Sequence, residues 1–117
     1  MHASWHVCGY NRDPHRNIGV YTTLDVDSAD EILPALDTVL ADCQRAVDCI
    51  SSMADLTSGI FVSLTPTCHR VEYGNVLYEK RTWESWRLVK GEPTPEQEDI
   101  LTIAMTRVFL AFPEKIP

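Results

Sequence analysis

The chain has 117 residues and a formal net charge of −7, with 44% hydrophobic and 23% charged residues. This length supports a single hydrophobic core, and the composition is typical of a folded protein and excludes a disordered one. No run approaches the roughly 18–20 apolar residues of a membrane span, and the first residues lack the pattern of a signal peptide. We therefore expect one cytoplasmic globular domain over residues 1–117.

The negative charge of the chain is concentrated in one segment. Residues 25–55 contain eight acidic residues and one basic residue, Arg45, whereas the rest of the chain has nine of each. This segment therefore carries a charge of −7, equal to the net charge of the whole protein. Such a field attracts a basic partner and repels nucleic acid and anionic membranes, so we expect neither nucleic acid nor a membrane as a partner.

Two strands are predicted at the start of the chain. Residues 4–10 and 19–26 have the short alternating pattern of strands, with Val20, Leu24 and Val26 on one face of the second. The polar residues 11–17 between them have the composition of a loop with a turn.

A helix is predicted to open near Ser28. Ser28 and Glu31 have the spacing of a capping box, and Pro34 falls in or near the first turn, where proline is tolerated. Asp37 and Asp48 lie on the side opposite the apolar residues. The apolar residues recur at helical spacing and predict the buried stripe of this helix: Ile32, Leu36, Val39, Cys43, Val47 and Ile50.

Strands follow this helix. Residues 59–64 form a short apolar run, and Gly74-Asn75 between residues 70–73 and 76–80 is a two-residue hairpin signal. We expect the second hairpin strand to continue, with a bend, through residues 83–89, until Gly91-Glu92-Pro93 ends it.

The last predicted element is a helix with a clear start. Thr94 is the N-cap, Pro95 occupies the first helical position, and Gln97 completes a capping box; the helix ends before Pro113. The element order is therefore ββαβββα. We predict a single α+β domain with a largely antiparallel sheet and two helices packed on it.

Histidine and cysteine give only a weak metal signal. His6, Cys8, Cys68 and His69 lack the paired spacing of zinc ligands, and they stay a candidate for a metal or small-molecule site only if the fold brings them together. The acidic run 25–31 resembles a calcium loop in composition but lacks the glycine at its sixth position. We expect no cofactor and no bound metal.

The four cysteines are expected to be reduced. Cys43 and Cys49 lie six residues apart on one predicted helix, about 9 Å of rise. That separation exceeds the roughly 7 Å between Cα atoms that a disulfide can span.

The segment 80–90 interleaves basic residues with tryptophan, as nucleic-acid surfaces do. Trp83 and Trp86 have opposite parity on a strand, so they cannot form one stacking platform, and Glu79 and Glu84 dilute the charge. One tryptophan is expected in the core and the other at an edge. The chain also lacks the linear motifs of hydrolases, metalloproteases and nucleotide-binding enzymes, so we expect a protein that is not an enzyme.

Two surfaces are predicted to bind other proteins. The first is the acidic side of the first helix, and the second is an apolar side of the last helix. The predicted partner-binding residues are Asp30, Asp37, Asp42 and Asp48, and the predicted oligomer interface is Ile103, Phe109 and Leu110.

Three functional hypotheses follow from these features. The first is a non-enzymatic protein that binds a basic surface of a partner protein, as inhibitors, immunity proteins and phage-encoded blockers do. The second is a structural or assembly protein that self-associates, for example as a homodimer, through its last helix. The third is a module that binds a small molecule or a metal.

Overall fold

A computed structural model of the chain describes residues 2–11 and 16–114. The elements in chain order are β1 (His2–Asn11), β2 (Arg16–Asp25), α1 (Ile32–Ser52), β3 (Ile60–Leu64), β4 (Cys68–Tyr73), β5 (Val76–Arg81), β6 (Arg87–Lys90) and α2 (Pro95–Ala111). Short 3-10 turns, Ala29–Glu31 and Met53–Asp55, flank α1. Residues 12–15 of the predicted first loop lie outside the described residues.

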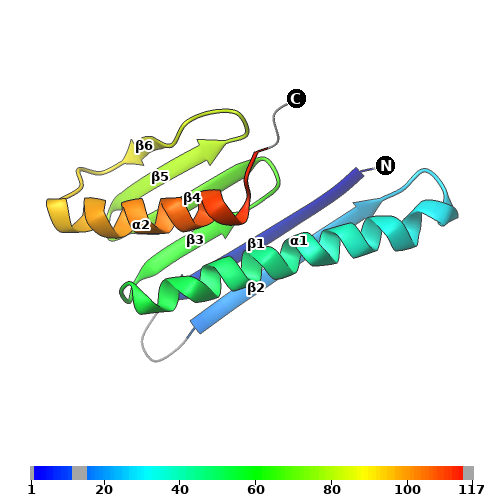
Figure 1. Cartoon of the computed structure of the whole chain (residues 1–117), viewed down its shortest axis with the longest axis horizontal. Coiled ribbons are helices and arrows are strands. Elements are labelled where there is room, and N and C mark those ends of the chain that lie inside the picture. The colour runs from blue at the N-terminus through cyan, green and yellow to red at the C-terminus, as the bar shows by residue number, and fades with distance from the viewer. Residues whose placement is uncertain (1, 12–15, 115–117) are drawn as a thin grey trace.

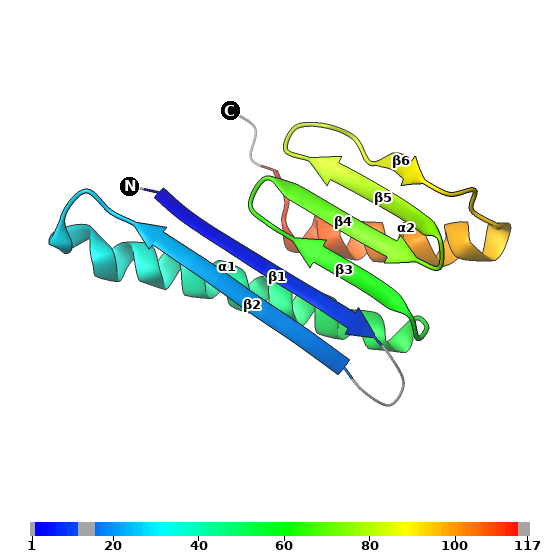
Figure 2. The same ribbon diagram turned by 180° about the vertical axis from the view of Figure 1, so that it is seen from behind.

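The strands form one antiparallel sheet with the order β2-β1-β3-β4-β5-β6. Both helices cover the same face of this sheet, with α1 across β1 and β2 and α2 over β4 and β5 (Figure 1). No described helix covers the opposite face, which Figure 2 shows from the front. The predicted α+β domain is therefore confirmed. Within the described residues, neither helix has the length and hydrophobicity needed to cross a membrane.

The segment after the β4–β5 hairpin differs from the prediction. The expected continuous strand is divided, because the chain turns after Arg81 and returns as β6 alongside β5. Trp83 lies in this turn with a positive φ of 66°, and the Glu84 N–H donates to the Arg81 carbonyl. Trp86 packs against the core and Trp83 is exposed, which matches the expected division of roles between the two tryptophans.

The two helices begin differently. At α2, the Thr94 side chain accepts a hydrogen bond from the Gln97 N–H. The Gln97 side chain in turn accepts one from the Thr94 N–H, so the predicted capping box is confirmed. At α1 the predicted box is wrong. Ser28 makes no side-chain capping bond, and the Glu31 carboxylate instead accepts from the Asp27 N–H at 3.1 Å.

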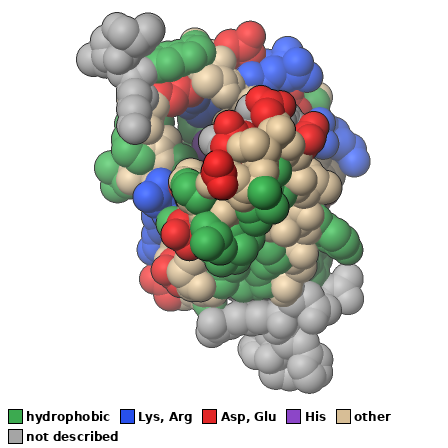
Figure 3. Space-filling view, turned by 90° about the vertical axis from the view of Figure 1, so that its right-hand side faces the viewer, with side chains coloured by type: hydrophobic (Ala, Val, Ile, Leu, Met, Phe, Trp, Pro, Cys, Tyr) green, Lys and Arg blue, Asp and Glu red, His purple; other side chains and the backbone are tan. Residues whose placement is uncertain are grey.

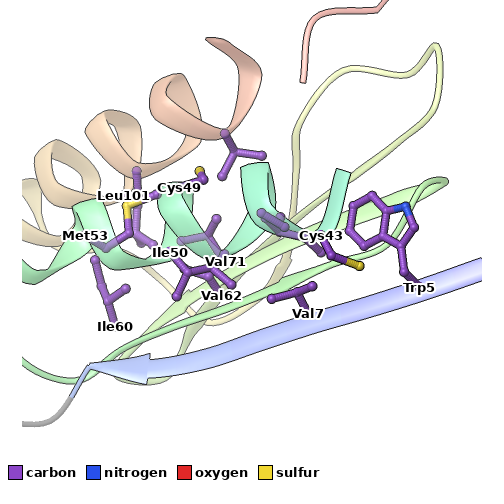
Figure 4. Packing of buried hydrophobic residues seen from close by; sticks show 14 of the residues in the cluster. Trp5, Val7, Cys43, Cys49, Ile50, Met53, Ile60, Val62, Val71 and Leu101 are labelled. Carbon is purple, nitrogen blue, oxygen red and sulfur yellow. The ribbon is translucent and has the colours of Figure 1, made fainter. Parts of the chain in front are cut away.

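The core lies between the sheet and the helices. Val7 from β1, Val62 from β3 and Val71 from β4 point toward the helices, and Leu101 of α2 closes the core from above (Figure 4). In the same view Cys43 of α1 lies directly over Val7. Alternate residues of β1, β3 and β4 therefore line one continuous apolar layer.

The buried side of α1 is only partly the predicted one. The buried residues are Ala35, Val39, Cys43, Ala46, Cys49 and Ile50. Ile32 and Leu36, which were predicted to be buried, are exposed. Small residues at positions 35 and 46 let the helix approach the sheet closely, and this orientation leaves the larger leucines on the outer flank of α1.

Candidate functional site

The outer side of α1 carries the predicted acidic surface. Asp37 and Asp48 are exposed on the helix, and Asp30 is exposed in the turn that precedes it. Figure 3, which views the end of the molecule where α1 begins, shows acidic side chains gathered there beside an apolar patch. The structure therefore exposes these three carboxylates to solvent on α1 and the turn that leads into it.

The carboxylates of this surface differ in their partners. The side chains of Asp30 and Asp37 make no hydrogen bond or ion pair with any described residue. The Asp48 carboxylate accepts a hydrogen bond from the Gln44 side chain at 2.9 Å. Asp42 lies apart from them, at 3.4 Å from Arg45 and turned toward the C-terminal segment. The charges of Asp30 and Asp37 are the least compensated of the four.

A shallow groove of about 730 Å³ separates α1 from α2. Gln44, Asp48 and Ser52 line its α1 side, and Leu110 lines its α2 side. At its end Arg107 donates to the Asp55 carboxylate at 2.7 and 3.2 Å and also to the Ser52 carbonyl. The Arg107 guanidinium lowers the pKa of Asp55, so this carboxylate is already paired within the chain.

A second cavity, of about 500 Å³, lies near the end of α2. His69, Lys80 and Glu114 line it together with Trp5 and Trp83. The Lys80 ammonium donates to the Glu114 carboxylate, which also accepts from the Trp83 N–H. This ion pair lowers the pKa of Glu114.

His69 is neutral at physiological pH. Burial and the nearby Lys80 charge lower the pKa of its imidazole to about 4, and its ring lies 5.4 Å from that of Phe112. The lining residues that the structure describes include neither serine nor cysteine. The cavity thus offers charge and aromatic surface, without a nucleophile of these types beside the imidazole.

The predicted histidine and cysteine candidates do not converge. His6 and Cys8 lie on the face of the sheet opposite the helices, where the His6 Nε2 atom is 2.7 Å from the Ser63 hydroxyl. Cys68 lies on that same face, but His69 points toward the helices. No group of three or more metal-ligating side chains occurs within residues 2–11 and 16–114.

All four thiols are free. Cys43 and Cys49 lie in the core, and burial raises the pKa of Cys49 to about 11. A thiol with such a pKa is protonated at neutral pH and is a poor nucleophile.

The predicted apolar surface of α2 is exposed. Ile103 and Leu110 lie two turns apart on one side of the helix. Phe109 borders a hollow of about 260 Å³ beside Trp86 and Met105. No described segment covers Ile103, Phe109 or Leu110.

One ionic cluster was missed in the sequence analysis. Glu79 of β5 is only 2% exposed, yet three arginines surround its carboxylate on the face without helices. Arg70 donates to it at 2.8 Å, Arg81 at 3.1 Å and Arg87 at 3.3 Å. These three guanidinium groups lower the pKa of Glu79 to about 2.

The signal for this cluster was present in the predicted hairpin. A two-residue turn at Gly74-Asn75 pairs Arg70 with Glu79, and Arg81 follows on the same face. The contribution of Arg87 required the reversal of the chain into β6, which the sequence did not reveal.

Comparison with known proteins finds no matching family model, no similar curated protein and no similar solved structure.

Proposed function

We propose that this chain is a small, acidic, non-enzymatic protein that binds a basic surface of a partner protein through the outer side of α1. The observation that carries this proposal is the exposure of Asp30, Asp37 and Asp48 on α1 and the turn before it. Among the described residues, neither Asp30 nor Asp37 has an ion pair. Carboxylates without an internal partner retain their full field toward solvent.

The charge pattern favours fast association with an oppositely charged surface. The segment 25–55 carries the whole net charge of −7, so its field extends beyond the surface by about one Debye length, roughly 8 Å at physiological salt. Complementary charge raises the association rate, and added salt reduces it. Inhibitors, immunity proteins and phage-encoded blockers use this type of recognition, and the chain has the size and charge of that class.

The test is an affinity capture from the lysate of the native host, with wild type beside Asp37→Lys/Asp48→Lys. We expect one basic protein to bind wild type, to be lost with the double variant, and to be released by salt. The matched control is Glu84→Lys/Glu92→Lys, which makes the same change in net charge at exposed positions away from α1. Retention of the partner by the α1 variant, or its equal loss from the control, would contradict the proposal.

A second candidate function is assembly through α2. It is favoured by the exposure of Ile103, Phe109 and Leu110 on one helix. If α2 is the interface, Ile103→Asp/Leu110→Asp converts an oligomer into a folded monomer, which the mass in solution measures directly.

A further inference from the structure

Among the residues that the structure describes, no strand pairs with one long edge of the sheet. β2 is the outermost strand, ten residues long, and it pairs with β1 over its whole length on its other side. Its only charged residues are those at its two ends, Arg16 and Asp25, and it contains no proline. Natural proteins blunt such edges with lysine, proline, bulges or short strands, because an unpaired edge is a template for another strand.

An apolar surface adjoins this edge on the helix side. Val20 pairs with the buried Val7 across the β1–β2 ladder, so its side chain lies on the face that α1 covers, yet it is 46% exposed. On α1, Leu33 and Leu40 are 72% and 53% exposed, and Leu36 is exposed between them. On the other face of the sheet, Tyr21 of the same strand is 69% exposed.

The exposed leucines lie on the flank of α1 that faces away from α2. The residues of α1 that line the groove toward α2 include Ala41, Gln44 and Ser52, which occupy other positions around the helix. Leu33, Leu36 and Leu40 are spaced by three and four residues, as in the seam between two packed helices. This flank and the open edge of β2 therefore belong to one continuous side of the molecule (Figure 1).

We propose that this side is the interface of a homodimer in which β2 pairs antiparallel with β2 of a second copy. A two-fold axis perpendicular to the sheet, at the centre of β2 near Val20 and Tyr21, joins the two sheets and keeps all helices on one face. The pairing satisfies the outward-facing N–H and C=O groups of β2, because strand edges of the same sequence are self-complementary in antiparallel register.

The spacing of the helices fits this arrangement. Since strands lie about 4.8 Å apart, two α1 helices that each lie across the last two strands would be separated by about 10 Å. Packed helices are typically 8–10 Å apart, so Leu36 and Leu40 would contact α1 of the second copy. A standard stable interface buries about 800 Å² per partner. In this arrangement the whole ten-residue edge of β2 and the exposed apolar side chains of β2 and α1 would all contribute to the buried area.

The charges of α1 remain outside this interface. Asp37 and Asp48 lie further around the helix, on the side away from the sheet. The dimer would bring two acidic helices close together, so their repulsion opposes it and added salt should strengthen it. Partner binding by the acidic surface should instead weaken with salt, so failure of one proposal is distinguishable from failure of the other.

The test is to measure the mass of the full chain by analytical ultracentrifugation at protein concentrations from 1 to about 500 µM. This range detects dimers with micromolar dissociation constants. We expect wild type to reach twice its 13.2 kDa monomer mass. We expect Val20→Asp/Leu40→Asp to dissociate at least about 100-fold more readily, because each copy would bury unpaired charges. The matched control, Leu88→Asp/Val89→Asp, makes the same charge change at exposed apolar positions of β6 and should retain the dimer. The variant Ile103→Asp/Leu110→Asp tests the competing interface on α2 and should also retain it.

Two further measurements keep the proposal falsifiable. If the double variant does not fold, Tyr21→Lys makes the same test at a more exposed position. Hydrogen exchange of wild type should show β2 amides that become protected as concentration rises. A wild type that stays monomeric throughout, or a dimer that is lost with the α2 variant and kept with the β2–α1 variant, would overturn the proposal.

Discussion

The two halves of the sheet differ in how completely their charged groups are paired and their edge strand is protected within the monomer. In the half formed by β4, β5, β6 and α2, the buried charges are paired, Glu79 with three arginines and Lys80 with Glu114. Its edge strand β6 has four residues, of which the first and last are basic, and a register shift interrupts its pairing. This edge has the devices that prevent further strand addition.

The half formed by β1, β2 and α1 lacks these devices. Its edge strand has ten residues, and apolar side chains of β2 and α1 face solvent. Asp30 and Asp37 have no partner among the described residues. One half of the sheet is thus paired and protected within the monomer. The other half exposes an acidic surface, an apolar flank and an open strand edge.

The largest expected effect contrasts two leucines in the two helices. Leu101 of α2 is fully buried, so Leu101→Ala should lower the free energy of unfolding by about 2–5 kcal/mol, because it leaves a cavity. Leu33→Ala on the flank of α1 should change it by less than about 0.5 kcal/mol in dilute, monomeric protein. Urea unfolding of both variants measures this difference. Equal losses in the free energy of unfolding would contradict the prediction.

A second prediction concerns the ionic cluster of the completed half. Glu79→Gln removes the charge that holds three arginines together, so we expect a clear loss of thermal stability at pH 7. Glu72→Gln, on the same face of the neighbouring strand β4, is the matched control and should have little effect. If Glu72→Gln lowers thermal stability as much as Glu79→Gln, the loss does not come from the Glu79 cluster in particular.

The same cluster predicts a pH dependence. The pKa of Glu79 is lowered from 4.5 to about 2 in the folded chain, so its carboxylate contributes stability above about pH 4.5. This contribution is lost as the pH falls from 4.5 toward 2. The gap in urea midpoint between wild type and Glu79→Gln should therefore narrow over this range, and a constant gap would contradict the proposed origin of the effect.

The smallest expected effect compares the two helix starts. Thr94→Ala removes a formed capping bond and should cost about 1 kcal/mol of stability. Ser28→Ala removes a side chain that caps nothing and should cost less than about 0.5 kcal/mol. Equal costs in urea unfolding would show that Ser28 contributes in a way that its position does not reveal.

Much of the fold was predictable because its signals are local. Thr94, Pro95 and Gln97 determine the start of α2 within one turn, and Gly74-Asn75 determines the β4–β5 register within two residues. The capping box at Ser28 had the same sequence signal but failed, since a 3-10 turn places the Glu31 carboxylate on the Asp27 N–H instead. A local pattern decides an element only where the connecting backbone has the matching geometry.

The candidate sites were predictable only in part. The exposure of Asp30, Asp37 and Asp48 followed from charge and helical periodicity. The separation of His69 from Cys68 was predictable, because neighbouring residues of a strand point to opposite faces. The separation of His69 from Cys8 was not, because it depends on how β1, β3 and β4 pair. The cluster at Glu79 likewise needed β6 to bring Arg87 alongside.

The sequence by itself determined the class of fold, the two helices, the central hairpin and the acidic character of α1, because each depends on residues close together in the chain. Only the tertiary structure decided the strand order, the rotation of α1 that exposes its leucines, and the position of β2 at the open edge. These features depend on which elements pack together, and packing is settled by competition between surfaces that are distant in the sequence.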